Sequence, residues 1–466
     1  MILMTKKLKI VALFVVFILG YTNFSFELII LRQLVNFIGS NTLIISVIMS
    51  TILMFLSVGY YIGSIVKFSK YPIRKMICFT LLLLTMWYMF SCFYYSSNLF
   101  FFLISKITRE HLVLVFAYSF LFLIIPSLGV GFLTSVLGRV LHHYNSDYTG
   151  RFMATDTIGS VIGSLVTTLL IMPFLGISYA VVLLIIMTAF LICLLGRKKD
   201  ILLNTIIFIL CSVCAFTIRY FESTAVNGIL IKDDAVSRLE IIQQDGGQSV
   251  MMRINGQPAS KISENSDLMF KYVNFINKNF IDNLNDDKVY QILVLGAGGF
   301  TIGLNDKKNQ YTFLDIEKNL KKIAEEFFLP DPLSENKQFM AQDAYLYMIN
   351  TKQQYDIIIV DVYSSLHNIP EHFVTVDFFK KIKDHLSKNG IMLANIITSP
   401  SFENKFAKRI DNTLRQVFPR FLSRQVIGNF NPYSADTHNI IYIFYNRKTD
   451  DNFYTIDKNS AMYGQM

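Results

Sequence analysis

Seven long apolar runs fill the first half of the chain, and short stretches rich in charged residues separate them. Each run has at least 17 residues, the length that a helix needs to cross the hydrocarbon core of a bilayer. The pattern predicts about seven membrane-spanning helices over residues 1–218, and it leaves open a re-entrant run or a further crossing at Asn98–Ser105. The runs lie at about residues 8–28, 42–66, 76–97, 112–137, 153–175, 178–196 and 201–217.

The charge of the chain follows the same division. Up to residue 218 there are 15 Lys and Arg against 5 Asp and Glu, whereas the rest of the chain carries 28 against 29. The net charge of +9 therefore comes from the apolar half. Cytoplasmic loops of membrane proteins are enriched in Lys and Arg, so this excess indicates membrane topology and not nucleic-acid binding.

Two features of the predicted spans stand out: Glu27 and Arg32 near the end of the first, and Asp156 near the start of the fifth. Such groups are costly at membrane depth and are often functional. The simpler interpretation is that each lies at an interface or neutralises another group. Gly159 and Gly163 have the small-xxx-small spacing that lets helices approach closely, so helix packing is expected there.

All five cysteines fall in the apolar runs, which predicts neither a disulfide framework nor a metal site in the polar half. Cys211 and Cys214 have CxxC spacing, but within an apolar segment they are expected to be small residues facing lipid or another helix. The five are Cys78, Cys92, Cys193, Cys211 and Cys214.

From Asp233 the pattern changes to short strands with alternating side chains. SRLEIIQQ and SVMMRING are typical of paired strands, and Asn255-Gly256 is typical of a tight turn. A helical stretch follows at Asp267–Phe280. The pattern predicts a β-rich lid with a connecting helix over residues 219–285.

A buried strand then runs into a glycine-rich turn at QILVLGAGGF, residues 291–300. Gly296, Gly298 and Gly299 would let the backbone approach a nucleotide, and a helix amino terminus after them would favour polar or negative ligand atoms. Such a turn is weak evidence alone. The motif lacks a Walker A lysine, which argues against a phosphate-hydrolysing P-loop, while a nicotinamide enzyme remains open.

Three further strand ends carry acids. YTFLDIE ends in Asp315 and Glu317 about 20 residues after the glycine turn, where an acid can bond ribose hydroxyls. AQDA contains Asp343, and YDIIIVDVY ends at Asp361. Each acid alone is equally well explained as a helix cap or a solvated loop residue. Because ligands of open α/β sheets bind at the carboxyl ends of strands, the ordered set predicts a Rossmann-like nucleotide-binding domain over residues 286–450.

These motifs resemble those of the spermidine synthase (polyamine aminopropyltransferase) family, and more closely its bacterial membrane-fused variants. GAGGF resembles the family's glycine motif, Asp315 and Glu317 its ribose pair, and Asp343-Ala344 its adenine-side motif. Asp361 is similar to its gate-loop aspartate, and DVYSSLHNIPEHFVTVDFF resembles the membrane-fused pattern that starts there. FELIILRQL and DTIGSVIGS resemble membrane segments of those variants.

Two departures from the family concern the acceptor amine. Soluble members carry a second gate-loop aspartate where this chain has Ser364, and a Tyr-His pair where it has Lys271-Tyr272. A desolvated ammonium needs a paired negative charge. Losing an acid and gaining Lys271 therefore leaves the identity of the acceptor open.

The resemblance implies aminopropyl transfer from decarboxylated S-adenosylmethionine to an amine. Asp361 would then orient the ammonium and help to remove its proton, with Tyr363, Ser364 and His372 beside the acceptor. A plain loop position is an equally simple interpretation of His372. The donor would be a co-substrate, with no tightly bound cofactor and no metal.

Two alternatives stay open: methyl transfer from intact S-adenosylmethionine, and a membrane transporter or sensor with a regulatory nucleotide-binding domain. The expected partners are a small amine and the lipid bilayer, without nucleic acid, and a homo-oligomer is left open. The chain is expected to be a multi-pass protein of the cell membrane with its transferase domain in the cytoplasm, where the donor is found. Seven crossings from a cytoplasmic amino terminus place that domain outside, and the sequence leaves this conflict unresolved.

Overall fold

A computed structural model describes residues 6–38, 42–67, 73–104, 107, 111–144, 148–195, 201–223, 228–234, 237–362, 369–429 and 438–447. The chain divides into two compact units, one that ends at Glu264 and one that begins at Asn265. The first unit holds the apolar helices together with a small sheet. The second holds a larger α/β domain.

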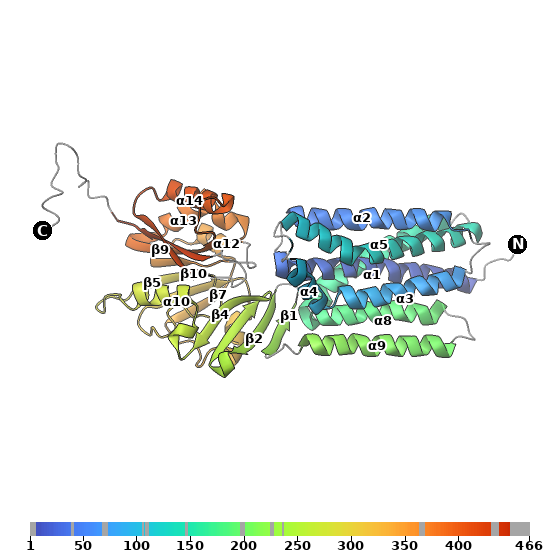
Figure 1. Cartoon of the computed structure of the whole chain (residues 1–466), viewed down its shortest axis with the longest axis horizontal. Helices are drawn as coiled ribbons and strands as arrows, with labels where there is room; N and C mark the ends of the chain where they lie inside the picture. Colours follow the sequence, from blue (N-terminus) through green and yellow to red (C-terminus); the bar gives the residue numbers. More distant parts are fainter. Residues whose placement is uncertain are drawn as a thin grey trace. The chain divides into compact units, whose positions relative to one another are not determined.

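Long apolar helices lie side by side in the first unit (Figure 1). Within the described residues, seven of them are long and apolar enough to cross a membrane, in agreement with the predicted number of spans. The helices are α1 (Lys6–Ile38), α2 (Thr42–Ile65), α3 (Ile73–Ser91), α4 (Tyr94–Ile104), α5 (His111–Tyr144), α6 (Tyr148–Val166), the π-helical turn Thr167–Ile171, α7 (Met172–Leu175), α8 (Ile177–Leu195) and α9 (Ile201–Ser223).

The short helix α4 occupies the segment that the sequence left open as a further crossing. Its 11 residues rise about 16 Å, roughly half of the ~30 Å hydrocarbon core of a bilayer. Its rings pack on the neighbouring helices, since Phe101 stacks on Phe37 of α1 at 4.5 Å and on Tyr118 of α5 at 5.4 Å. The helix α4 is therefore a bundle-end element and not an additional span.

Helices α1 and α6 approach each other through glycines. A Cβ atom added to Gly159 would lie 2.2 Å from the carbonyl oxygen of Phe17, and one added to Gly163 would lie 2.4 Å from that of Tyr21. Only a glycine fits at such distances, so the close helix packing expected from the spacing of these glycines is confirmed. One turn further on, the hydroxyls of Ser25 and Thr167 share a buried 2.7 Å hydrogen bond.

The small sheet of the first unit is antiparallel and follows the chain order β1-β2-β3-β4. Its hairpin turn Asn255-Gly256 has φ angles of 53° and 75°, the left-handed pair that a two-residue turn between twisted strands requires. The turn predicted from this Asn-Gly pair is therefore confirmed. The strands are β1 (Gly228–Asp233), β2 (Arg238–Gln244), β3 (Ser249–Ile254) and β4 (Gln257–Ser263).

Arg32, near the end of α1, joins the helices to the small sheet. Its Nε donates to the carbonyl oxygen of Asp234 at 2.8 Å, and its Nη2 donates to Oδ1 of Asn255 at 3.3 Å. The same Oδ1 accepts the backbone N–H of Arg238 at 3.0 Å. The position of this arginine within an apolar run is thereby explained, because it bonds the sheet that packs on the end of the bundle.

A second arginine, Arg238 of β2, is 2% exposed and lies at the centre of a buried ionic cluster. Its guanidinium contacts Asp233 at 2.7 Å and Glu240 at 2.8 Å, and it stacks 4.1 Å from the ring centroid of Tyr94 in α4. A buried guanidinium is tolerated only with such partners. The cluster ties the helical bundle and the sheet into one compact unit.

The second unit contains a seven-stranded sheet in the order β10-β11-β9-β8-β5-β6-β7. Neighbours from β7 to β9 are parallel, and β11 and β10 add antiparallel strands at one edge. Its strands are β5 (Gln291–Leu295), β6 (Gln310–Asp315), β7 (Lys337–Ala341), β8 (Tyr355–Val360), β9 (Leu386–Thr398), β10 (Leu422–Asn429) and β11 (His438–Tyr445). Its helices are α10 (Lys271–Ile276), α11 (Leu320–Phe327), α12 (Ala344–Asn350), α13 (Val376–Asp384) and α14 (Lys405–Val417).

The strand order reverses between β5 and β8. From β5 the chain builds outward to β6 and β7, and it then returns to lay β8 on the other side of β5. Both central strands are nearly continuous apolar sequences because both faces of a parallel sheet are buried. The predicted fold class, a helical membrane-type domain followed by an α/β domain, is confirmed.

The compact units divide the chain differently from the three parts expected from sequence. Helix α9 continues to Ser223, and the small sheet groups with the helices and not with the connecting helix α10. The predicted boundaries 1–218, 219–285 and 286–450 therefore remain predictions. The predicted polar tail, 451–466, lies outside the described residues.

Candidate functional site

The glycine turn after β5 lies against the end of β8, at the place where the strand order reverses. Gly296 has φ +89°, and a Cβ atom on it would lie 2.1 Å from the carbonyl oxygen of Asp361. Gly298 also has a positive φ, of 50°. The backbone N–H of Asp361 donates to the carbonyl oxygen of Leu295 at 2.8 Å. Two of the three predicted glycines therefore have left-handed backbones, and the third, Gly299, is buried in the same turn.

Asp315 connects the glycine turn to the end of β6. Its Oδ2 accepts the backbone N–H of Ala297 at 3.2 Å, and its Oδ1 accepts that of Glu317 at 3.0 Å. Burial raises the pKa of this carboxyl, while the backbone hydrogen bonds oppose that effect. Each oxygen keeps lone pairs for a further donor such as a ribose hydroxyl.

The other two predicted nucleotide-binding acids follow neighbouring strands. Glu317 is 4% exposed, and its Oε1 accepts the backbone N–H of Asn319 at 3.1 Å. Asp343 is the N-cap of α12, where its Oδ1 accepts the backbone N–H of Leu346 at 3.0 Å. The helix-cap interpretation of Asp343 is thus confirmed. This role leaves its second oxygen free of the cap bond, so capping does not exclude ligand binding.

Asp361, the residue after β8, is held on both oxygens. The hydroxyl of Tyr272 donates to its Oδ2 at 2.8 Å, and Nδ2 of Asn395 donates to its Oδ1 at 2.9 Å. Burial raises the pKa of the Asp361 carboxyl, and the two hydrogen bonds oppose that effect. A carboxylate fixed in this way, with an increased affinity for protons, has the properties of a general base.

The sequence missed both residues that hold Asp361. Tyr272 was considered only as part of a departure from the family motif, and Asn395 was not considered. A signal for Asn395 existed: it is a polar residue within the apolar run IMLANIIT of β9, one position after Ala394, which pairs with Val360. A buried amide in such a strand needs a hydrogen-bonding partner, and Asp361 supplies one.

The predicted acceptor-side residues are only partly described. Tyr363 and Ser364 lie outside the described residues. His372 is exposed in a 3-10 turn, Glu371–Val374, with its ring 5.1 Å from that of Tyr345 in α12 and 4.3 Å from that of Phe373. Its contacts are therefore those of an aromatic cluster next to α12. Its predicted role beside the acceptor stays a prediction.

Lys271, the other departure from the family motif, lies against β10. Its side chain approaches Gly428, where an added Cβ would lie 3.1 Å from its Cδ and 3.7 Å from its Nζ. The residue is exposed, unlike the neighbouring Tyr272, which is 6% exposed. Of these two adjacent residues of α10, the tyrosine is therefore buried and bonded to Asp361, whereas the lysine lies at the surface.

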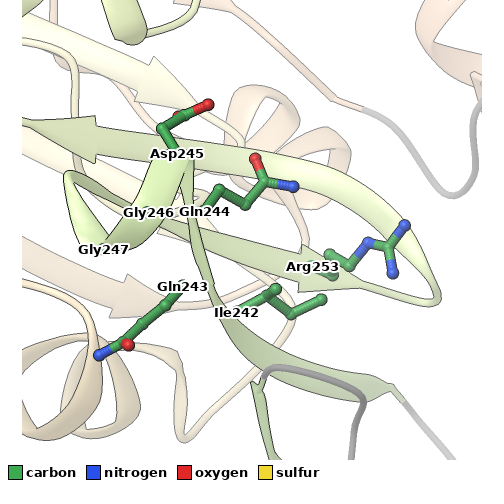
Figure 2. A pocket seen from close by; sticks show the side chains of 7 residues that line it. All are labelled: Ile242, Gln243, Gln244, Asp245, Gly246, Gly247 and Arg253. Carbon is green, nitrogen blue, oxygen red and sulfur yellow. The ribbon is translucent and has the colours of Figure 1, made fainter.

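A hollow of about 740 Å³ lies elsewhere, at the β2–β3 turn of the small sheet. Figure 2 shows Gln243 and Gln244 on opposite sides of the chain there, as strand alternation requires. None of the predicted site residues lines it, so it gives no support to the predicted site. Its lining residues are Ile242, Gln243, Gln244, Asp245, Gly246, Gly247 and Arg253.

The second unit matches a known protein family. Residues 286–427 match the model of the spermine/spermidine synthase domain. The matched segment runs from just before β5 into β10, so it contains the glycine turn, all four predicted acids and Asn395. The α/β domain belongs to the spermidine synthase family. The helical half of the chain lies outside the matched residues.

Two curated proteins resemble this spermidine synthase domain. A polyamine aminopropyltransferase of Vibrio vulnificus (strain CMCP6) is 28% identical over 163 residues, which cover 33% of this chain and 52% of that protein. A probable polyamine aminopropyl transferase of Bifidobacterium longum (strain NCC 2705) is 25% identical over 157 residues, covering 33% and 32%. The chain thus spans about half of the first relative and a third of the second.

Two solved structures are also similar to the spermidine synthase domain. A probable spermidine synthase from Corynebacterium glutamicum ATCC 13032 has 21% identity and a TM-score of 0.39, over 49% of this chain and 82% of that one. Spermidine synthase from Thermotoga maritima has 16% identity and a TM-score of 0.35, over 45% and 69%.

Proposed function

We propose that the chain is a membrane-bound aminopropyltransferase that moves an aminopropyl group from decarboxylated S-adenosylmethionine to an amine. The single observation that supports this most is the carboxylate of Asp361, held by Tyr272 and Asn395 directly against the glycine turn of a spermidine synthase domain. That position combines a base with a nucleoside-binding edge of the sheet.

The reaction needs a neutral amine nitrogen beside an electrophilic carbon. The amine lone pair forms a bond to the carbon next to the sulfonium, and the carbon–sulfur bond breaks with its electron pair passing to sulfur. The products are methylthioadenosine, a neutral thioether, and an alkylated ammonium that loses one proton. A positioned base contributes about 10²- to 10⁴-fold to such a step.

Asp361 is proposed to accept that proton. Its raised pKa increases its affinity for the proton of an acceptor ammonium, and its negative charge orients that ammonium toward the donor. Tyr272 and Asn395 position the carboxylate and do not themselves touch the reacting atoms in this proposal. Tyr363, Ser364 and His372 remain the proposed acceptor-side residues, on the basis of sequence alone.

The nucleoside would be bound at the ends of β5, β6 and β7. Gly296, Gly298 and Gly299 supply a closely approachable backbone, while Asp315 and Glu317 supply oxygens for the ribose hydroxyls. Asp343 is proposed for the adenine side. This assignment is supported by the order of these residues along one edge of the sheet.

Membrane attachment is the second part of the proposal. It is supported by the seven apolar helices of the first unit, several of which expose large apolar side chains such as Leu53, Phe79 and Leu202. A water-soluble bundle would bury these side chains, whereas lipid accommodates them. We propose that the chain is a multi-pass protein of the cell membrane.

The donor is identified by calorimetric binding of the full chain, purified in detergent, to decarboxylated S-adenosylmethionine, intact S-adenosylmethionine and methylthioadenosine. Tighter binding of the decarboxylated donor, and release of methylthioadenosine when amines are added, supports aminopropyl transfer. Preference for the intact donor together with S-adenosylhomocysteine release would replace the proposal by methyl transfer.

Absence of binding to all three nucleosides would contradict an enzyme and favour a transporter or sensor. That alternative was suggested by Glu27, Arg32 and Asp156, which are ionisable residues in the apolar half of the chain. Arg32 is explained by its bonds to the small sheet, and Asp156 is half-buried where α6 packs closely on Gly20 of α1. Glu27 is 4% exposed within the helical unit and remains the strongest of the three motives.

A further inference from the structure

The helical bundle has two ends that named contacts distinguish. The small sheet lies at one end, where Arg32 near the end of α1 bonds Asp234 at 2.8 Å. The turn between α7 and α8 lies at the same end, since a Cβ on Gly176 would be 2.9 Å from the carbonyl oxygen of Asp233. We call this the sheet end, and Figure 1 shows the strands β1 and β2 there.

The last helix, α9, also finishes at the sheet end. Arg219 near its end stacks 3.8 Å from the ring centroid of Tyr179, which lies at the start of α8. The chain then enters β1 five residues after Ser223. The sheet end therefore collects the ends of α1, α7 and α9 and the start of α8.

Another set of contacts defines the opposite end. Lys9 near the start of α1 lies 4.5 Å from the ring centroid of Tyr148 at the start of α6. Near the end of α5, Nη1 of Arg139 donates to the carbonyl oxygens of Gly63 and Val66, at the end of α2, at 2.8 Å each. We call this the basic end. The amino-terminal part of α1 thus lies at the end of the bundle away from the small sheet.

Basic residues are divided unequally between the segments at the two ends. The helix ends and connecting segments on the side of the basic end, together with the first residues of the chain, carry 12 Lys and Arg, whereas those on the side of the sheet end carry four, of which Arg32 is bonded to the sheet. The 12 are Lys6, Lys7, Lys9, Lys67, Lys70, Arg74, Lys75, Arg139, Arg151, Arg197, Lys198 and Lys199. The four are Arg32, Lys106, Arg109 and Arg219.

Short loops rich in Lys and Arg stay in the cytoplasm, because their translocation is disfavoured. The basic end is therefore the cytoplasmic end. An extra crossing that would reverse this assignment is absent from the described residues, because α4 is too short and no span-length apolar helix follows Ser223. The conflict between crossing number and expected location thus has one resolution that agrees with both the charges and the helices.

We infer that the small sheet and the α/β domain that follows it face the non-cytoplasmic side of the membrane. The chain passes from Glu264 at the end of the first unit directly to Asn265 in the second. Within the described residues, no span-length apolar helix follows Ser223, so the small sheet and the α/β domain lie on the same side. This inference opposes the cytoplasmic location expected from the donor alone. It depends on charge and helix direction, and not on the activity.

A consequence for the reaction sequence follows, and this part depends on the proposed function. A nucleoside donor with a charged sulfonium does not cross a bilayer unaided, because transfer of a charge into hydrocarbon is strongly unfavourable. A transport step must therefore deliver the donor to Asp361, and methylthioadenosine must be released on the same side. The acceptor is then an amine available outside the cytoplasm.

The test is cysteine labelling of the full chain in spheroplasts of a bacterial host. The five native cysteines are replaced by Ser, and then Glu264→Cys at the sheet end or Lys67→Cys at the basic end is introduced, both positions being exposed. A membrane-impermeant maleimide should label the Glu264→Cys protein in intact spheroplasts and the Lys67→Cys protein only after permeabilisation. Labelling of both proteins after permeabilisation is the control for accessibility.

Labelling of the Lys67→Cys protein in intact spheroplasts, or protection of the Glu264→Cys protein there, would overturn the inference. A second measurement does not depend on cysteine replacement: alkaline phosphatase fused after Met466 should be active, and green fluorescent protein at the same place should be dark. The reverse pattern would also overturn the inference. Neither readout requires catalysis, so failure of the proposed function and failure of the topology are distinguishable.

Discussion

The hydroxyl of Tyr272 donates a hydrogen bond of 2.8 Å to Oδ2 of Asp361, 89 positions further along the chain. The tyrosine lies on α10, before the first strand of the large sheet, and the aspartate follows β8. Asn395 of β9 holds the other oxygen at 2.9 Å. The orientation of this carboxylate is thus set by two elements that are far apart in sequence.

Replacing Tyr272 by Phe should shift the pH dependence of turnover as well as its rate. Without the hydroxyl, the ionised carboxylate loses a hydrogen bond, so the pKa of Asp361 rises further above its ordinary value. We expect a loss of roughly tenfold in kcat, the effect of about one charge-assisted hydrogen bond, and an acidic limb of the kcat/KM profile displaced to higher pH. The measurement is a pH–rate profile from about pH 5 to 10.

Tyr347→Phe is the matched control for that profile. Its hydroxyl is hydrogen-bonded to that of Tyr355 in the same domain, with no acid in the pair. This change should lower thermal stability without moving the acidic limb. An unchanged limb in Tyr272→Phe would show that the tyrosine only supports packing.

Asp361→Asn should reduce kcat by about 10²-fold or more while nucleoside affinity changes little. An amide preserves the shape, because its oxygen can still accept Nδ2 of Asn395 and its Nδ2 can donate to the Tyr272 oxygen. Asp356→Asn is the control on the same strand, β8, where the acid bonds Lys288 and the backbone of Gln291. Equal loss of turnover in the two variants would exclude a specific role for Asp361.

These two aspartates should also have opposite effects on stability as the pH changes. Burial raises the pKa of Asp361, so its ionisation opposes folding, and Asp361→Asn should melt at a higher temperature than wild type at neutral pH. That gain should shrink as the pH falls from the raised pKa toward the ordinary value of about 4, where the wild-type carboxyl is protonated.

Asp356 has a lowered pKa: burial alone would raise it, but hydrogen bonds from Lys288, Gln291 and Ser387 outweigh that effect. Its ionised form therefore stabilises the fold at pH values above its ordinary pKa, and this contribution is lost as the pH falls through the lowered pKa. Asp356→Asn should accordingly melt at a lower temperature at neutral pH, with the deficit disappearing in acid. Melting curves recorded by far-UV circular dichroism at several pH values test the direction of the change in melting temperature for both variants.

Gly296→Ala should abolish nucleoside binding and destabilise the α/β domain. The substitution combines a left-handed backbone, φ +89°, with a Cβ only 2.1 Å from the carbonyl oxygen of Asp361. Gly247→Ala separates these effects, because Gly247 has φ +91° and nothing within 4 Å of the added Cβ. The control should lose only about 1 to 2 kcal/mol of folding stability and keep nucleoside binding, as measured by calorimetry. Comparable binding by the two variants would contradict the close approach at Gly296.

The central strands and their acids could be predicted from sequence for a physical reason. Buried parallel strands are continuous apolar runs, and ligand-binding residues follow them directly, so QILVLGAGGF and YDIIIVDVY carry their own positions. Long apolar helices are equally evident. These signals are local, and they placed Gly296, Asp315 and Asp361 at one edge of the sheet.

Interactions between distant segments could not be predicted in this way. Arg32 and Asp234 are 202 positions apart, and nothing local to either residue indicates the other. The connection of Asn395 to Asp361 likewise depends on which strands become neighbours. The side of the membrane on which the α/β domain lies could be inferred only from the directions of the helices. Those directions depend on the finding that α4 is too short to cross the membrane.

The ionic cluster between the helices and the small sheet determines where the chain can be shortened. A recombinant protein beginning at β1 would keep Arg238, Asp233 and Glu240 but lose the covering ring of Tyr94 and the guanidinium of Arg32. The buried cluster would then be broken and opened to solvent, which destabilises the small sheet. A protein beginning at Asn265 leaves that cluster behind altogether, so it is the better choice for crystallising the α/β domain alone.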